Sequence, residues 1–173
     1  MASASYNRLS IALHWIAAVS VIALFFTHEG SRDSLSYQFH VAGGAAIGIL
    51  LIWRVVRRMR RGFATKPDQH WLFNLASTLV IWGLLIAILV VTLTGYLLPW
   101  TIGQPLDIAG LIAVPSPLPV MPALHEAMEE IHDISGHLIV PLVLLHTLGA
   151  IKHLVWDRDT VMHRMFRADS DGR

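Results

Sequence analysis

Four long runs of residues without a formal charge constrain this chain more than any other feature of its sequence. They hold 19, 20, 38 and 18 residues and lie at Leu9–Thr27, Ser34–Trp53, Gln69–Leu106 and Ile134–Ile151. A helix needs about 20 mostly apolar residues to cross a bilayer. Lipid offers the backbone no hydrogen-bond partners, and the runs lack the alternation of barrel strands, so they predict membrane-spanning helices.

These runs predict an all-α integral membrane protein, a four-transmembrane-helix bundle that forms a single membrane domain over residues 1–173. The expected helices cover about 9–27, 38–58, 71–98 and 130–154, with a proline-rich, apolar outer loop at about 99–129. The first run is expected to be a retained helix rather than a cleaved signal peptide. Only Arg8 precedes it as a basic flank, and no small-residue cleavage site follows it.

The composition excludes several other classes of protein. Only 14% of the residues are charged, against about 25% in soluble domains. A soluble monomer and a nucleic-acid-binding protein are therefore not expected, whereas contact with membrane lipid is. The chain has no cysteine, which excludes disulfides, iron–sulfur clusters and a cysteine nucleophile.

The basic residues predict the orientation of the chain. Twelve of the 13 lie before the first span, between the second and third, or after the fourth. Loops rich in Lys and Arg stay in the cytoplasm, so both termini are predicted to be cytoplasmic. The outer segments carry a net charge of −6, with histidines counted as neutral.

Four histidines are placed to form two pairs inside this bundle. His132 and His146 are 14 residues apart on the last span, so they lie within about 40° of one face and roughly 21 Å apart along the axis. Antiparallel threading puts His14 level with His146, and His40 level with His132. Facing imidazoles bind iron well, so the pattern predicts two bis-histidine b haems that transfer electrons.

Several neighbouring residues leave alternatives open. His28 also follows His14 by 14 residues and could replace His40. His125 and His153 share the faces of His132 and His146, His137 is expected to face elsewhere, and His70 and His163 are expected to be solvated. Gly43, Gly44 and Gly48 provide either room for a porphyrin or close helix packing. Arg54 lies one haem level below His40 and is expected to pair with a haem propionate or to snorkel to the interface.

Three segments of the sequence resemble the bacterial cytochrome b561 family. They are Tyr6–Trp15, Phe39–Gly44 leading on to Trp53 and Arg54, and His146–His153 followed by Trp156–Asp159. The resemblance covers nearly the whole chain in the correct order. It implies haem ligands at His14, His40, His132 and His146, and it favours His40 over His28.

The resemblance also implies a function. The family consists of four-helix inner-membrane proteins that carry two b haems and exchange electrons with quinone. We therefore expect a multi-pass cytochrome of the bacterial inner membrane that links an outer redox partner to the quinone pool. The resemblance also implies superoxide oxidation with quinone reduction, which at least one member type performs. The acidic outer segments instead favour a cationic protein surface or a neutral quinone over anionic superoxide.

Two other functions remain open at this point. One is a haem-binding anchor subunit of a larger redox complex, and the other is a non-redox membrane protein with packing histidines. The sequence does not locate a quinone site. His70 and Trp71, at the start of the third span, are a weak candidate, and an interfacial anchor is the alternative.

Overall fold

The computed structural model describes residues 8–61 and 69–158 of the chain, and it contains the four expected helices. They are α1 (Arg8–Thr27), α2 (Leu35–Arg61), α3 (Trp71–Thr101) and α4 (Pro122–Val155), with a small antiparallel hairpin of β1 (Leu106–Ile108) and β2 (Ile112–Val114) between α3 and α4. Each helix is long and apolar enough to cross a membrane. The predicted all-α, four-span fold class is confirmed.

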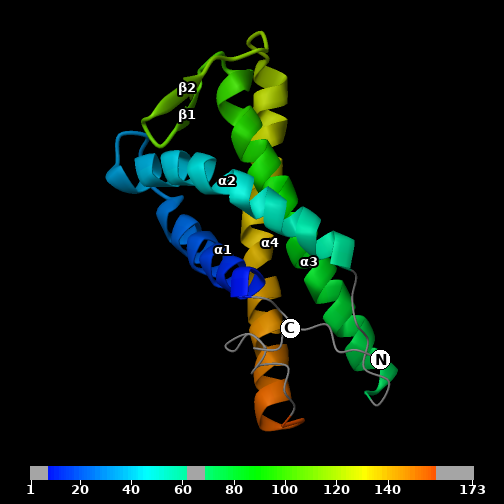
Figure 1. Ribbon diagram of the computed structural model, residues 1–173. Helices are drawn as coiled ribbons and strands as arrows, with labels where there is room; N and C mark the ends of the chain where they lie inside the picture. The colour runs from blue at the N-terminus through cyan, green and yellow to red at the C-terminus, as the bar shows by residue number, and fades with distance from the viewer. Residues whose placement is uncertain (1–7, 62–68, 159–173) are drawn as a thin grey trace.

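The helices pack as two neighbouring hairpins (Figure 1). The most extensive contact joins α3 to α4, while α2 packs on both α1 and α3 and crosses α3 steeply. One end of the molecule, here called the basic end, holds the starts of α1 and α3 and the ends of α2 and α4. The opposite end, called the hairpin end, holds the β1–β2 hairpin, which also touches α2.

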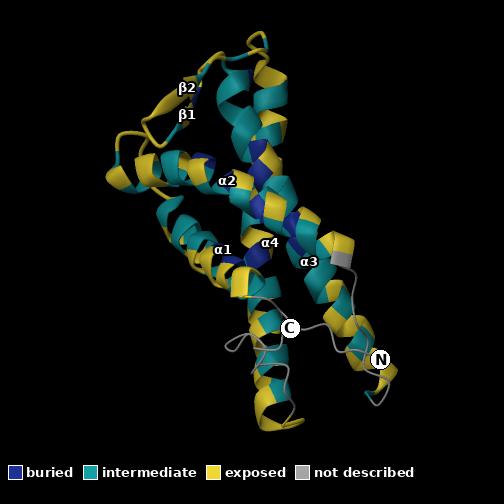
Figure 2. Cartoon of the chain, in the orientation of Figure 1, coloured by how far each residue is buried: buried dark blue, intermediate teal, exposed yellow. Residues whose placement is uncertain are grey.

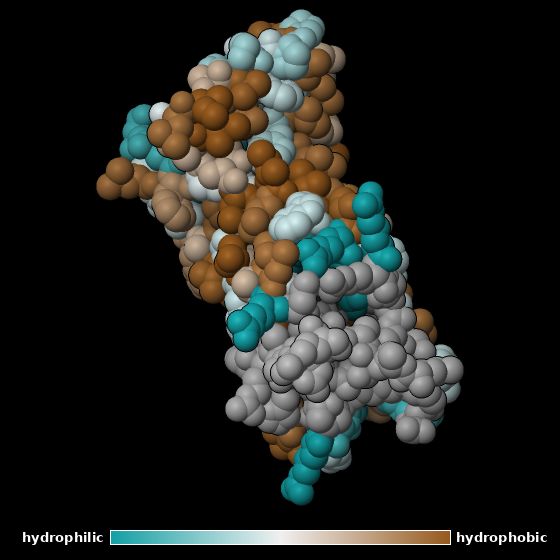
Figure 3. All heavy atoms as spheres, viewed as in Figure 1, coloured by the Kyte–Doolittle hydropathy of each residue, from teal (hydrophilic) through white to brown (hydrophobic). Residues whose placement is uncertain are grey.

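Few apolar side chains of the described residues are buried. Figure 2 shows that the buried residues form a thin seam where helices meet, and Figure 3 shows hydrophobic residues over much of the visible surface. The buried apolar residues are Leu13, Ala17, Ala45, Leu51, Val55, Leu85, Ala87, Leu106 and Ile139. Lipid tails are as apolar as these side chains, so the exposed surface is suited to lipid contact, and close packing has to hold the helices together.

The helix boundaries differ from the expected ones, mostly at the hairpin end. α4 begins at Pro122 rather than near residue 130, α3 ends at Thr101 rather than 98, and α2 covers 35–61 rather than 38–58. The loop expected at 99–129 is therefore reduced to 102–121, and it contains the hairpin. Charge-free runs mark the depth of the hydrocarbon, whereas a helix continues into the headgroup region with charged residues such as Glu126 and Glu130. Pro122 suits the first turn of α4 because its missing N–H is not needed there.

Gly48 lets α2 and α3 approach each other closely. A Cβ at this position would lie 2.8 Å from Cζ of Tyr96 and 2.9 Å from Cγ2 of Thr92, both on α3. The Tyr96 hydroxyl donates a hydrogen bond to the backbone oxygen of Ala45 at 2.9 Å and fixes the contact. Of the two interpretations of the glycines, close helix packing holds for Gly48.

We expect Gly48→Ala to lower the free energy of unfolding by about 1–3 kcal/mol, because the added methyl group overpacks the α2–α3 contact. Gly43→Ala is the matched control, since its Cβ would meet Leu24 Cδ2 at an ordinary 3.7 Å. Thermal melting in detergent measures the difference. Equal melting temperatures for the two variants would contradict the packing role of Gly48.

Candidate functional site

The four histidines singled out by spacing meet as two pairs of rings. At the basic end, His14 of α1 and His146 of α4 have ring centroids 6.2 Å apart with planes inclined by 72°. At the hairpin end, His40 of α2 and His132 of α4 have centroids 6.0 Å apart with planes at 87°. α4 thus contributes one histidine to each pair, and the partners come from the other helix hairpin.

Both separations fit two imidazoles on opposite sides of one metal ion. A metal–imidazole bond is about 2 Å long, and the ring centre lies about 1 Å behind the bonding nitrogen, which gives centroids about 6 Å apart. The observed values of 6.2 and 6.0 Å match this spacing. The side chains present therefore fit bis-histidine coordination of haem iron at two levels of the bundle.

The hairpin-end pair is held with one ring nitrogen of each histidine already engaged. Nδ1 of His40 donates to the backbone oxygen of Leu24 at 2.8 Å, and Nδ1 of His132 lies 3.1 Å from Oγ1 of Thr94. The Thr94 hydroxyl itself donates to the Val90 carbonyl, so it accepts from His132. Both rings then keep Nε2 as the free ligand atom, an arrangement usual for histidines that bind metals.

A glycine makes room for the His132 ring. A Cβ on Gly95 of α3 would lie 3.0 Å from Cε1 of His132. A larger residue at this position would force the His132 ring to shift. Thr94 and Gly95 therefore position His132 together, although they lie on a helix that supplies no histidine to the pairs.

The basic-end pair lies beside two arginines of α2. The Arg54 guanidinium donates to Nδ1 of His14 at 2.5 Å. Arg58 is close enough to His146 to interact with it electrostatically. Of the two orientations expected for Arg54, inward or snorkelling to the interface, the structure shows the inward one.

Three of the remaining histidines have local structural partners. His125 contacts the buried hydroxyl of Thr101 at 2.8 Å, and His70 caps α3 by accepting from the Leu72 N–H at 3.3 Å.

The third, His153, lies 2.8 Å from Asp157, just beyond α4. Lys152 donates to both carboxylate oxygens of Asp157 at 2.8 Å and lowers the pKa of this carboxyl. His163 lies outside the described residues.

His28 and His137 lie next to the hairpin-end pair. The centroid of His28 is 6.4 Å from that of His40 and 5.4 Å from that of His137. The sequence spacing left His28 and His40 as alternatives, and the structure places His40 against His132. His137, which was expected to face elsewhere, packs against His28 and Phe25.

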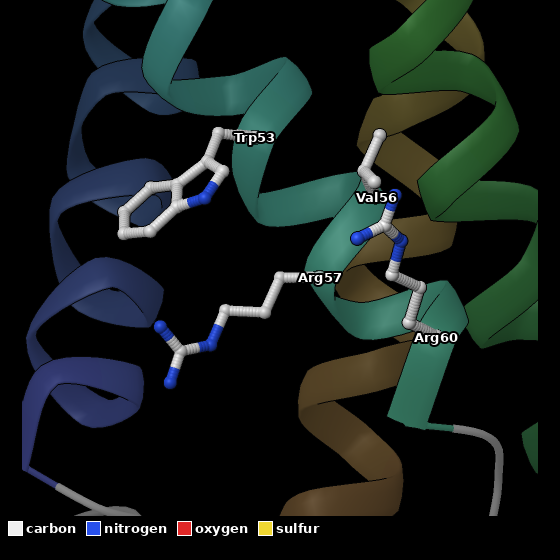
Figure 4. A pocket seen from close by; sticks show the side chains of 4 residues that line it. All are labelled: Trp53, Val56, Arg57 and Arg60. Carbon is white, nitrogen blue, oxygen red and sulfur yellow. The ribbon is translucent and has the colours of Figure 1, made fainter.

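A hollow of about 360 Å³ lies at the basic end of α2. Trp53, Val56, Arg57 and Arg60 line it (Figure 4). The guanidinium carbon of Arg57 is 5.6 Å from the Trp53 ring centroid, so a cation and an aromatic face lie side by side. Trp53 directly precedes Arg54, which contacts the basic-end pair.

Comparison with known proteins identifies the family of this chain. Residues 5–168 match the family model described as prokaryotic cytochrome b561. The chain is also 28% identical over 178 residues to cytochrome b561 homolog 2 of Escherichia coli strain K12, an alignment that covers 95% of this chain and 93% of that protein. The match includes all four spans. The chain therefore belongs to the prokaryotic cytochrome b561 family, as a multi-pass bacterial membrane protein that binds haem b and transfers electrons.

Proposed function

We propose that this protein carries electrons across the bacterial inner membrane, between a redox partner on the outer side and the quinone pool, through two haem b groups. The observation that carries the proposal is the presence of two histidine pairs at bis-imidazole spacing. Each pair has one member on α4, and these two residues, His132 and His146, are 14 residues apart. This separation is roughly 21 Å of helix. The pairs thus lie near opposite faces of a hydrocarbon core about 30 Å thick.

In this proposal, His14 and His146 bind the haem at the basic end, and His40 and His132 bind the haem at the hairpin end. The haem supplies one-electron chemistry at the iron. The chain supplies ligand orientation: the Leu24 carbonyl and the Thr94 hydroxyl hold the hairpin-end rings in the tautomer that presents Nε2.

We expect His146→Ala to remove the basic-end haem and retain the hairpin-end haem, whereas His132→Ala should do the opposite. The haem content per chain should fall by half in each variant, because each loses one of the two histidines that would hold a single haem. Pyridine haemochrome analysis measures the content, and redox titration identifies the remaining haem. His125→Ala is the control and should retain both. A His146→Ala protein with full haem content would refute the pairing.

Arg54 must change partner when haem binds at the basic end. An imidazole that binds iron through Nε2 carries its proton on Nδ1, so Nδ1 of His14 can no longer accept the hydrogen bond that Arg54 donates. A guanidinium has no acceptor atoms and binds carboxylates in a forked geometry. We therefore propose that Arg54 pairs with a propionate of the basic-end haem.

We expect Arg54→Gln to lower the reduction potential of the basic-end haem, because loss of a nearby positive charge favours the oxidised iron. The haem at the hairpin end should be unaffected. Redox titration followed by optical absorption measures both potentials. Arg60→Gln is the matched control, since Arg60 lines the hollow on another face of α2. Equal potentials in the wild type and Arg54→Gln would rule out the propionate contact.

The hollow at the end of α2 is the proposed quinone site. The Trp53 ring offers a flat apolar surface, and Arg57 and Arg60 offer donors for quinone carbonyls. Ala46 and Ile49 lie on the same helical face as Trp53 and are exposed, with Ile49 64% accessible, so an isoprenoid tail has an apolar path towards the membrane interior. His70 and Trp71 fit an anchoring role better, because His70 caps α3.

We expect Trp53→Ala to slow the reduction of the haems by added quinol about tenfold, through loss of the stacking surface. Trp71→Ala should leave the rate unchanged. Stopped-flow absorption on the haem-loaded, purified chain measures both. A slower rate in Trp71→Ala and an unchanged rate in Trp53→Ala would move the quinone site to the start of α3. A wild-type protein that does not react with quinol would favour the anchor-subunit function.

The charge of the hairpin end favours a cationic donor. Exposed carboxylates of α4 surround the start of the last span near His132, namely Glu126, Glu129, Glu130 and Asp133. Fields of this sign speed the approach of cations and slow that of anions such as superoxide.

We expect superoxide to reduce the hairpin-end haem slowly, and faster as salt screens the carboxylates. A small basic redox protein should show the opposite dependence on salt. Pulse radiolysis and stopped-flow absorption measure the two rates. A near diffusion-limited superoxide rate that falls with salt would show that superoxide is attracted, and would contradict the cationic donor.

A further inference from the structure

A cluster of metal-binding side chains lies beside the hairpin-end pair and takes no part in it. His28 follows the end of α1, and Asp133 and His137 lie one helical turn apart on α4. We propose that these three residues form a separate binding site for a divalent transition-metal ion, with Zn²⁺ as the best-matched ion. Two imidazole nitrogens and one carboxylate suit zinc and leave a fourth position for water.

The ligand atoms of the cluster gather within a space slightly wider than that of an occupied zinc site. One ligand atom from each residue lies within 4.8 Å of the others. Asp133 and His137 already meet through an atom other than the proposed ligand Nε2, since Nδ1 of His137 is 3.2 Å from Oδ1 of Asp133. Zinc bonds of about 2.0–2.1 Å place neighbouring ligand atoms about 3.3 Å apart. The Asp133 and His137 side chains are 63% and 53% exposed, so small rotations can close the site without disturbing packed residues.

Both histidines are arranged as zinc ligands usually are. Nδ1 of His28 donates to the backbone oxygen of Phe25, and Nδ1 of His137 donates to the backbone oxygen of Asp133 at 2.9 Å. Each contact fixes the tautomer that leaves Nε2 with a free lone pair. Metal-binding histidines typically donate their other ring N–H to a carbonyl or carboxylate in this way. The neutral imidazoles and the carboxylate would leave one net positive charge on the occupied site.

An ion bound here would have two physical consequences. It would join the end of α1 to the middle of α4 and so resist separation of the two helix hairpins. It would also place positive charge near His40, whose ring centroid is 6.4 Å from that of His28. That charge favours the reduced form of a neighbouring haem and raises its reduction potential. The exposed carboxylates of α4 attract divalent cations to the same face.

The test uses haem-loaded chain without a polyhistidine tag, treated with a chelator and then titrated with Zn²⁺ by calorimetry. We expect one site in the wild type, and a loss of affinity of at least tenfold in His137→Ala and Asp133→Asn. His70→Ala, at the opposite end of α3, is the matched control and should bind like the wild type. Wild-type protein that binds no Zn²⁺, or His137→Ala that binds it equally well, would overturn the site.

Two further measurements distinguish metal binding at this cluster from haem binding. Co²⁺ in place of Zn²⁺ should give the intense visible absorption of a tetrahedral site in haem-free protein, where porphyrin bands do not interfere. His28→Ala should lose the metal and keep full haem content. Loss of a haem in His28→Ala would make His28 a haem ligand and overturn the proposal. If Zn²⁺ bound to the haem-free protein but not to the haem-loaded protein, the cluster would be part of a haem site, and the proposal of a separate zinc site would be overturned.

Discussion

The arrangement of this protein depends on the need to give imidazoles partners inside an apolar bundle. A polar ring placed among lipid tails and aliphatic side chains costs free energy unless its nitrogens are satisfied. α4 carries two such rings, His132 and His146, and each meets a histidine from the other helix hairpin about 6 Å away, centroid to centroid. The pairing therefore links the hairpins at two depths, in addition to the packing of α2 on α3.

The surroundings of the two pairs differ in charge. At the hairpin end, a carbonyl and a hydroxyl hold the rings, and exposed carboxylates lie nearby. At the basic end, Arg54 contacts His14 and Arg58 lies close to His146. Positive charge favours a reduced iron and negative charge an oxidised one. This asymmetry favours reduction at the basic end over reduction at the hairpin end.

Small residues decide how closely these groups approach. Gly48 admits Tyr96 between α2 and α3, and Gly95 admits the His132 ring against α3. The first contact sets the approach of α2, which carries His40, to α3, and the second places the His132 ring itself. A bundle held together by packing rather than by exclusion of water depends strongly on such positions.

The sequence by itself determined the four spans, the family and the candidate ligands, because hydrophobic length and the spacing of 14 residues fix depth and face along a single helix. The residue spacing alone left open whether His28 or His40 faces His132, although the family resemblance favoured His40. The sequence missed Thr94, the Leu24 carbonyl, the hairpin and the early start of α4. Only the tertiary structure decided these, and it also turned Arg54 inward onto His14 and brought His137 to His28. Contacts between helices depend on their relative rotation and crossing, which the periodicity of one helix does not contain.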